Sequence, residues 1–466
     1  MNLKQLLLLL SFFIYISANA QLSQLQSQKI DSLFAAWIEE GHPGGAIGIM
    51  RKGEIVYSKA FGLASLEYGV PNATETIFNT GSVSKQFTAM GIVLLHQRGL
   101  LSVDDDIRKY LPDMPDFGHK ITIRHMLHHT SGMRSLHAML ALAGWREDDS
   151  RTNEDLYRFM LKQKDLNFVP GEEYLYCNTG YMLMVNIIEN ITKEKFPQWM
   201  NANIFEPLGM ANTYVEDRYD RIVPNNATSY YQEKDGFYRA VEYWGYVGSG
   251  NMHSTTKDLL TWLHNFNEPK PGWEAAFEML KTTDKLNDGS DNNYAFGVNV
   301  GEFNGYDKVS HGGAIGGFRA NVSVYPEEEL GIAILTNFSS SNAGRIERNI
   351  ANILLVDKSP ETDEIASPNS KTEPELDEDV SKINLQDYTG KFYSPELEST
   401  MDIYLEDNQL MIHHARHGDF PINLVKKDQL EIPGFATLDV VRNKKKKITG
   451  VNISNGRARN VWFEKQ

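Results

Sequence analysis

Apolar and polar positions along residues 28–356 follow two patterns. Short strand-like runs flank a polar turn in AIGIMRKGEIVYSKAFG and again in VSVYPEEELGIAILTNF. Each pair predicts an antiparallel hairpin. Helical spacing of apolar residues marks SKQFTAMGIVLLHQRG, IRHMLHHTSG, GYMLMVNIIENIT and DLLTWLHNF, which lie between the two hairpins. Strands at both ends with helices between them predict an α/β domain whose sheet joins the two ends of the domain.

The pattern changes at residue 357. The stretch DKSPETDEIASPNSKTEPELDED is rich in Pro, Ser, Asp and Glu and poor in apolar residues, which predicts an acidic linker over 357–383. Short strand-like runs separated by turns fill 384–466, and Asn455-Gly456 is a hairpin signal. The sequence therefore predicts a main domain over 21–356 and a small all-β domain, a barrel or a sandwich, after the linker.

The first twenty residues form a separate segment. Lys4 precedes the apolar run LLLLLSFFIYI, and residues 18–20 read ANA, a small-x-small cleavage pattern. These features predict a signal peptide over 1–20 and a mature protein that is periplasmic or secreted. The alternative is a membrane anchor, but the run is short for a span of about twenty residues, so we expect no stable membrane span after signal removal.

Composition excludes some partners and some chemistry. The chain of 466 residues is long enough for two or three domains, and its net charge is −15. That charge argues against binding to nucleic acid or to an anionic membrane, because both attract basic surfaces. Cys177 is the single cysteine, so no intrachain disulfide forms, and no Cys-His signature surrounds it.

Two S-x-x-K matches, Ser82–Lys85 and Ser254–Lys257, are candidates for a nucleophile with its base. Serine and lysine at this spacing share one face of a helix, but two matches are about the number expected by chance. The second match lies in HSTTKDLLTWL, where Thr255 has capping-box spacing before an amphipathic helix. We therefore interpret the second match as an ordinary helix start.

The first match has a different context. The segment after Ser82 is apolar on nearly every side until Gln97, which predicts a buried helix. Lys85 in the first turn of that helix is unfavourable for the helix dipole and costly to bury without partners. A desolvated lysine also loses its proton more readily, which suits proton transfer. We therefore select Ser82 and Lys85 as the candidate pair.

These residues and three further stretches carry a family resemblance. FNTGSVSKQFTA resembles the active-site segment of the serine β-lactamase and penicillin-binding-protein-like hydrolases, which include class C β-lactamases, D-alanyl-D-alanine carboxypeptidases and class VIII esterases. ITIRHMLHHTSGM, FVPGEEYLYCNTGY and SHGGAIGGF match further family segments in the same order, over roughly 28–356. The resemblance implies a β-lactamase/transpeptidase-like fold, an antiparallel sheet flanked by helices plus a helical subdomain. The C-terminal domain more weakly resembles lipocalin-like β domains.

The resemblance implies roles for four residues that also suit acyl transfer chemically. Ser82 is the expected nucleophile, and Lys85 and Tyr176 are expected to share the role of base, since a phenolate is favoured beside a cationic lysine. Asn178 is expected to orient Lys85 and to bind a substrate amide. Tyr176 and Asn178 belong to the single Y-x-N of the chain, and a simple β-turn after Pro170 is the alternative interpretation.

The third motif departs from the family. His311-Gly312-Gly313 replaces the Lys-Thr-Gly of many members, and we expect these residues to contact substrate. The resemblance implies that the N–H groups of Ala314 and Ser82 form an oxyanion hole. The alternatives are a β-bulge for the glycines and a hydrogen-bonded strand histidine for His311. Histidine is a weaker, pH-dependent partner for an anion than lysine, which argues against strong β-lactamase activity.

No metal or organic cofactor is expected. His125 and His129 have i, i+4 spacing, but no glutamate completes H-E-x-x-H. The chain also lacks G-x-S-x-G, so an α/β-hydrolase elbow is unsupported.

The function predicted from the sequence is that of an exported serine hydrolase. It would cleave a small amide or ester, such as a D-amino-acid peptide or an acyl ester, through an acyl-enzyme on Ser82. One alternative is a β-lactamase or DD-carboxypeptidase acting on the cell wall. Another is a penicillin-binding sensor or scaffold without turnover. The partner is then a small molecule or short peptide, and the oligomeric state is left open.

Overall fold

The structure is a computed structural model that describes residues 21–356, 358 and 383–466. The predicted signal peptide and nearly all of the predicted linker lie outside the described residues. The chain divides into two compact units. The first takes the described residues of 1–100, 192–284 and 293–359, and the second those of 101–191, 285–292 and 360–466. The predicted domain boundaries stay predictions.

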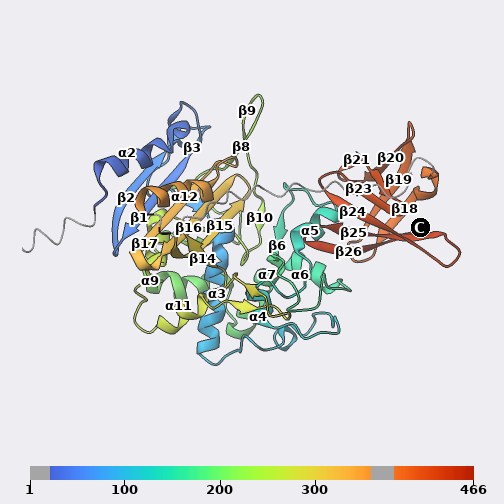
Figure 1. The fold of residues 1–466 in the computed structure, drawn as a ribbon, viewed down its shortest axis with the longest axis horizontal. Coiled ribbons are helices and arrows are strands. Elements are labelled where there is room, and N and C mark those ends of the chain that lie inside the picture. The colour runs from blue at the N-terminus through green and yellow to red at the C-terminus, as the bar shows by residue number, and fades with distance from the viewer. Residues whose placement is uncertain (1–20, 357, 359–382) are drawn as a thin grey trace, which may run out of the picture. The chain divides into compact units, whose positions relative to one another are not determined.

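An antiparallel sheet organises the first unit, with the strand order β14-β15-β16-β17-β1-β2 over its described residues. The central strand β1 pairs with β17 along its whole length, so both ends of the predicted domain meet in one sheet, as the blue and orange arrows of Figure 1 show. This confirms the predicted sheet and both predicted hairpins. The strands are β1 (Gly45–Arg51), β2 (Glu54–Phe61), β14 (Asn299–Phe303), β15 (Tyr306–Ile315), β16 (Phe318–Tyr325) and β17 (Leu330–Thr336).

Helices cover both faces of this sheet. On one face, Ile47 and Ile49 of β1 join a fully buried apolar cluster with α2 (Gln24–Ser32) and α12 (Ala343–Leu354). Gly48 lies between them and faces the opposite side, because side chains alternate along a strand. A Cβ on Gly48 would lie 2.8 Å from Leu260 Cδ1 of α10 (Thr256–His264), so glycine gives this helix room to pack.

The helix after Ser82 is buried on nearly all sides, as its apolar pattern predicts. It is α3 (Ser84–Gln97), and its residues from Ser84 to Leu95 are buried. α11 (Glu274–Leu280) packs against it. The other elements of the first unit are β3 (Leu63–Ser65), β4 (Val70–Pro71), β5 (Phe78–Asn79), α8 (Phe196–Met200), α9 (Glu206–Leu208), β7 (Tyr214–Val215), β8 (Tyr230–Glu233), β9 (Gly236–Arg239), β10 (Trp244–Gly245) and β11 (Met252–Ser254).

The second unit combines a helical part with the C-terminal β domain. Its helical part holds α4 (Ile123–Leu127), α5 (Leu136–Leu142), β6 (Arg151–Thr152), α6 (Asn153–Leu161) and α7 (Asn178–Thr192). The C-terminal domain is an antiparallel sheet in the order β21-β20-β19-β18-β26-β25-β24-β23-β22 within the described residues, which is barrel-like and nearly closed. This confirms the predicted all-β domain.

The strands of the barrel-like sheet are short and joined by tight turns. They are β18 (Gly390–Ser394), β19 (Ser399–Glu406), β20 (Gln409–His414), β21 (Gly418–Pro421), β22 (Asn423–Lys426), β23 (Gln429–Ile432), β24 (Ala436–Arg442), β25 (Ile448–Asn455) and β26 (Ala458–Lys465). The turn predicted at Asn455-Gly456 joins β25 to β26, and Gly456 has a φ of +47°. That left-handed conformation favours glycine at this position.

A buried ion pair joins the helical part to the barrel-like sheet. Arg134 Nη1 lies 2.7 Å from Glu396 Oε2, and both side chains are almost completely buried. The same guanidinium donates to the carbonyl oxygens of Arg459 and Asn460 in β26. Breaking such a pair typically costs about 3–5 kcal/mol, because the remaining charge stays buried without its partner.

No helix in the described ranges is both long and apolar enough to cross a membrane.

Candidate functional site

Ser82 and Lys85 lie together at the start of α3. Ser82 belongs to a 3₁₀ turn, Gly81–Val83, which runs directly into α3. Lys85 Nζ lies 3.0 Å from Ser82 Oγ, within hydrogen-bonding distance, and donates to the carbonyl oxygen of Ser249 at 2.7 Å. The Lys85 side chain is completely buried, whereas Ser82 is partly exposed. A desolvated amine beside an accessible hydroxyl is the arrangement that proton transfer requires.

The second S-x-x-K match is built differently. Thr255 caps α10 by accepting a hydrogen bond from the Asp258 N–H at 3.2 Å, which confirms the interpretation of this match as a helix start. Ser254 is buried and lies 2.8 Å from the Thr213 hydroxyl, whereas Lys257 is exposed.

Two glycines let the backbone of β15 lie directly against the turn that carries Ser82. Gly81 has a φ of +53°, and a Cβ there would lie 2.7 Å from the Ala314 nitrogen. A Cβ on Gly313 would lie 2.0 Å from the Thr80 carbonyl oxygen, an impossible distance. The backbones that carry the Ser82 and Ala314 N–H groups are therefore adjoining. Their role as an oxyanion hole stays a prediction, as does substrate contact by Gly312.

His311 is a buried, neutral histidine. Its Nε2 lies 2.9 Å from the Tyr294 hydroxyl. Burial lowers the pKa of His311 to about 3, and the nearby charge of Lys85 adds to this effect. A histidine with this pKa carries no charge near pH 7. The expectation that its charge could bind an anion therefore has no support at neutral pH, while contact between its ring and a substrate stays a prediction.

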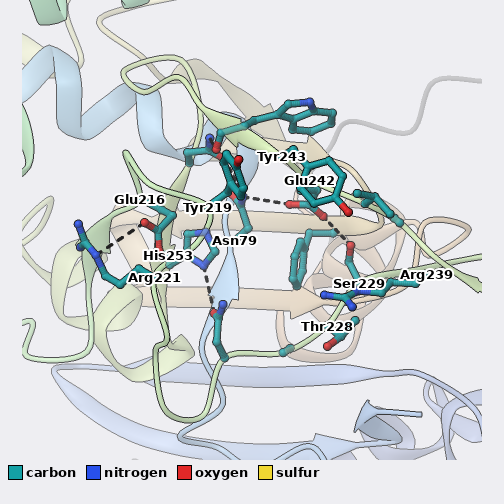
Figure 2. A pocket seen from close by; sticks show the side chains of 17 residues that line it. Asn79, Glu216, Tyr219, Arg221, Thr228, Ser229, Arg239, Glu242, Tyr243 and His253 are labelled. Atoms are coloured by element: carbon teal, nitrogen blue, oxygen red, sulfur yellow. Dashed lines mark hydrogen bonds and ion pairs between the residues drawn. The ribbon is translucent and has the colours of Figure 1, made fainter. Parts of the chain in front are cut away.

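Glu242 lies near the candidate site, and the sequence did not single it out. Figure 2 shows its carboxylate between Ser229 and Asn79; the Ser229 hydroxyl donates to Oε1 at 2.5 Å and Asn79 Nδ2 donates to Oε2 at 3.4 Å. Asn79 Oδ1 in turn accepts from the Gly81 N–H at 3.0 Å, beside Ser82. Glu242 is thus connected through one side chain to the turn that carries the candidate nucleophile.

Glu242 also lies against the turn between β15 and β16. A Cβ on Gly316 would lie 2.1 Å from Glu242 Oε1, so the carboxylate fills the space that this glycine leaves. Burial raises the pKa of Glu242 to about 7. No signal marks Glu242 in the sequence, because it lies in an irregular segment and its burial arises only from tertiary packing.

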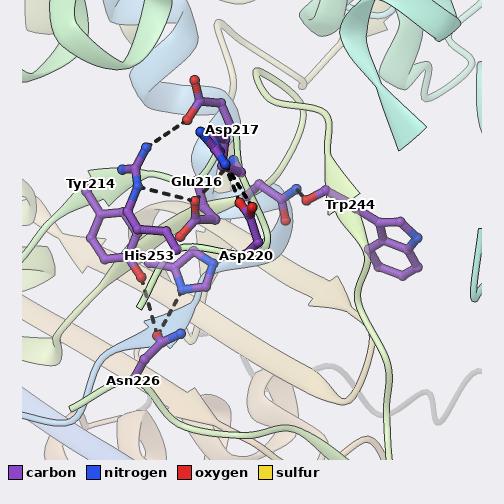
Figure 3. A network of polar contacts seen from close by, with 10 residues as sticks. Tyr214, Glu216, Asp217, Asp220, Asn226, Trp244 and His253 are labelled. Carbon is purple, nitrogen blue, oxygen red and sulfur yellow. Dashed lines mark hydrogen bonds and ion pairs between the residues drawn. The ribbon is translucent and has the colours of Figure 1, made fainter. Parts of the chain in front are cut away.

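A polar cavity of about 300 Å³ adjoins Glu242. In Figure 3, His253 and Tyr214 both point at Asn226, and His253 Nδ1 lies 3.1 Å from its Oδ1. Burial lowers the pKa of His253 to about 3, so this histidine is neutral near pH 7. Burial raises the pKa of Glu216, which also lines the cavity.

Tyr176 and Asn178 belong to the second unit, at the start of α7. The Tyr176 ring lies 4.2 Å from the His129 ring, centroid to centroid. His129 Nδ1 accepts from the Cys177 N–H at 3.1 Å and so holds the segment between the two predicted residues. Asn178 Oδ1 is buried without a hydrogen-bond partner among the described residues, a feature that often marks a ligand site. The catalytic and binding roles of both residues stay predictions.

The neighbouring histidines and Cys177 have structural contacts. His125 completes a capping box with Thr122 at the start of α4. Cys177 is buried, its Sγ lies 3.3 Å from the Met133 carbonyl oxygen, and burial raises the pKa of its thiol. Within the part of the chain that the structure describes, no group of three or more His, Cys, Asp or Glu residues could hold a metal ion.

Arg457, at the tip of the β25–β26 hairpin, is a second residue that the sequence did not single out. Its guanidinium carbon lies 5.0 Å from the centroid of the Tyr176 ring. The turn itself was predicted, but its contact with Tyr176 arises only from tertiary structure.

Known proteins resemble this chain over most of its length. The family model described as Beta-lactamase matches residues 27–357. "Penicillin-binding protein 4*" of Bacillus subtilis (strain 168) is 29% identical over 336 residues, which cover 68% of this chain and 73% of that protein. A "D-aminopeptidase" of Gluconobacter oxydans (strain 621H) is 26% identical over 321 residues, which cover 68% of this chain and 60% of the relative, less than two thirds of its length.

A solved structure extends the similarity to the C-terminal domain. The octameric penicillin-binding protein homologue from Pyrococcus abyssi has a TM-score of 0.63 and 25% identity, and the match covers 94% of this chain and 100% of that one. This similarity confirms the predicted β-lactamase/transpeptidase-like fold. Together with the family model, it shows that the chain belongs to the beta-lactamase family and is a hydrolase of that family.

Proposed function

We propose that this protein is a serine hydrolase that cleaves a small amide or ester through an acyl-enzyme on Ser82. The observation that carries the proposal is the 3.0 Å contact between Ser82 Oγ and the Nζ of a completely buried Lys85. The relative of Gluconobacter oxydans is named a D-aminopeptidase, which favours D-amino-acid amides and peptides as substrates.

The reaction has two halves. Ser82 Oγ attacks the substrate carbonyl carbon, and its proton passes to the base shared by Lys85 and Tyr176. The backbone N–H groups of Ser82 and Ala314 bind the oxygen that becomes negative. The carbonyl carbon then loses its amine or alcohol, which takes up the proton. In the second half, water attacks the acyl carbon and gives a proton to the same base. The bond from the acyl carbon to Ser82 Oγ then breaks, Oγ takes up that proton, and the acid leaves.

Asn178 and the strand 311–314 would bind the substrate and orient it. The exposed backbone of the glycine-rich strand can pair with an extended acyl chain, and the Asn178 amide can bind a substrate amide. We propose no metal or organic cofactor for this reaction. Export to the periplasm or the medium, on the basis of the N-terminal sequence, belongs to the same proposal.

Four kinds of probe separate this function from the alternatives. The full-length mature protein would be incubated with D-amino-acid p-nitroanilides, short p-nitrophenyl esters and a chromogenic cephalosporin. Ser82-dependent turnover of the first two supports the proposal. Fastest turnover of the cephalosporin would indicate a β-lactamase, and stable labelling by fluorescent penicillin without turnover of any probe would indicate a sensor. Unchanged activity in Ser82→Ala would refute the proposed mechanism.

A further inference from the structure

The tip of the β25–β26 hairpin is fixed against the helical part of the second unit by main-chain contacts. The carbonyl oxygen of Arg457 accepts hydrogen bonds from the Ser135 N–H at 2.9 Å and from Asn167 Nδ2 at 3.1 Å. Two residues further on, the Arg459 guanidinium forms a two-pronged ion pair with Glu173. The position of the Arg457 backbone is therefore well defined within this unit.

The side chain of Arg457 extends over Tyr176. Its guanidinium carbon lies 5.0 Å from the ring centroid, a distance typical of a cation–π contact, and the residue is exposed. The positive charge of Arg457 also affects the pKa of the residues that neighbour Tyr176 in sequence. Burial raises the pKa of both the Tyr174 phenol and the Cys177 thiol, and the positive charge of Arg457 opposes each rise. The positive charge of Arg457 thus acts on the residues on both sides of Tyr176.

The other arginines that join the helical part to the barrel-like sheet are all matched with a carboxylate. Arg134 pairs with Glu396 at 2.7 Å. Arg459 pairs with Glu173 at 3.0 Å, and Arg416 pairs with Asp149 at 2.6 Å. Arg457 has no carboxylate partner among the residues that the structure describes. The five N–H donors of its guanidinium are suited to a planar anion such as a carboxylate.

We propose that Arg457 binds a carboxylate of the substrate beside the bond that is cleaved. The inference rests on the proposed function, because it needs Tyr176 to lie at the reacting carbonyl. The buried His311 is neutral near pH 7 and supplies no cation for that purpose. The C-terminal domain then determines which substrates are accepted, and acidic acyl or leaving groups are preferred over neutral ones of the same shape.

Matched substrates test this inference on the full-length mature protein. One pair consists of esters of N-acetyl-D-alanine with 3-hydroxybenzoic acid and with 3-hydroxybenzamide, so that only the charge of the leaving group differs. A second pair places the carboxylate or carboxamide in the acyl part, as phenyl esters of N-succinyl-D-alanine and its succinamide. In at least one pair, Arg457→Met should lower kcat/KM for the acid about 10- to 100-fold, as expected for a charge-assisted hydrogen bond. The neutral partner should change less than about threefold, since it never made that bond.

Two further variants serve as controls for charge and for geometry. Arg457→Lys keeps a charge but loses the planar fork, so it should restore part of the preference for the acid. Lys445→Met removes an exposed positive charge from the same domain and should leave the preference unchanged. The contacts with Ser135 and Asn167 use the main chain of residue 457, and an unchanged melting temperature of Arg457→Met would verify that the fold is kept.

Three results would overturn the inference. The first is an equal loss on acid and amide, accompanied by a shift of the acidic limb of the pH–rate profile, which would mean that Arg457 acts on the ionisation of Tyr176. His129, Tyr174 and, through the proposed mechanism, Lys85 are the other titratable groups to consider there. The second is no change in either pair, and the third is the same loss in Lys445→Met. The proposed function would fail separately, through unchanged hydrolysis in Ser82→Ala.

Discussion

The two S-x-x-K segments have the same spacing and opposite environments. At the first, Lys85 is completely buried and its Nζ reaches the serine hydroxyl. At the second, Lys257 is exposed, and the neighbouring threonine caps a helix. The spacing itself is therefore uninformative. The chemistry depends on the helix that the motif begins, which is apolar all round in one case and amphipathic in the other.

The largest difference is expected from the two serines. Ser82→Ala should lower turnover of a D-amino-acid p-nitroanilide by on the order of a millionfold, as loss of a nucleophile does, whereas Ser254→Ala should stay within about threefold of the wild type. Mass spectrometry of the protein trapped with an acylating inhibitor would locate the acyl group. An inactive Ser254→Ala beside an active Ser82→Ala would reverse the assignment.

The two lysines should differ by a smaller factor. Lys85→Met removes the buried amine and should reduce kcat by about 10²–10⁴-fold, the typical contribution of a general base. Lys257→Met removes a solvated charge and should change kcat less than about twofold. Steady-state kinetics would measure both, with near-UV circular dichroism as a control for folding. Equal activities in the two variants would show that burial does not distinguish the motifs.

A pH-dependent contribution to stability is expected around the first motif. Glu242 has a pKa of about 7 in the folded state and an ordinary value near 4.5 when unfolded, so the folded protein binds the extra proton between these values. As pH rises from about 4.5 to 7, that contribution to the free energy of unfolding is lost, up to about 3 kcal/mol.

The variant Glu242→Gln keeps the size and shape of the side chain but has no group that titrates at this position. Urea denaturation at a series of pH values should therefore show the wild type losing stability relative to this variant between about pH 4.5 and 7. Parallel stability curves for the two proteins would mean that Glu242 has an ordinary pKa, and that the carboxylate beside the Ser82 turn is charged throughout.

The smallest effect is expected from the cap of the second motif. Thr255→Ala removes the acceptor for the Asp258 N–H and should lower the free energy of unfolding by about 1 kcal/mol, with no change in kcat. Ser82→Ala should instead lose its turnover while its free energy of unfolding stays within about 0.5 kcal/mol of the wild type. Thermal denaturation of both variants provides the measurement, and a loss of kcat in Thr255→Ala would contradict a purely structural role.

Local patterns predicted much of the fold. The two hairpins, the buried helix after Ser82 and the strands of the C-terminal domain arise from periodicity and turn residues, which act over a few neighbours in sequence. The side chain of Glu242 could not be predicted in this way, because its burial depends on Ser229, Asn79 and the turn at Gly316, which come from distant segments.

The same reason explains why Arg457 was missed in the second unit. A hairpin turn at Asn455-Gly456 is visible in the sequence, but the placement of the next residue, Arg457, over Tyr176 depends on how the C-terminal domain packs on the helical part. Sequence composition separated these regions at a linker, whereas the described residues of 101–191 form one compact unit with those of the C-terminal domain.

The pairing of β1 with β17 has a consequence for how the chain folds. Gly45 and Thr336 are opposite each other in the sheet but about 290 residues apart along the chain. Closing so long a loop is slow, and the contact cannot form until nearly the whole domain has been synthesised. Until then the β1–β2 hairpin exposes an edge that could pair with another chain. The last strand of this sheet to be synthesised thus covers the edge of the first strand, and folding intermediates lacking β17 should be the species most prone to aggregate.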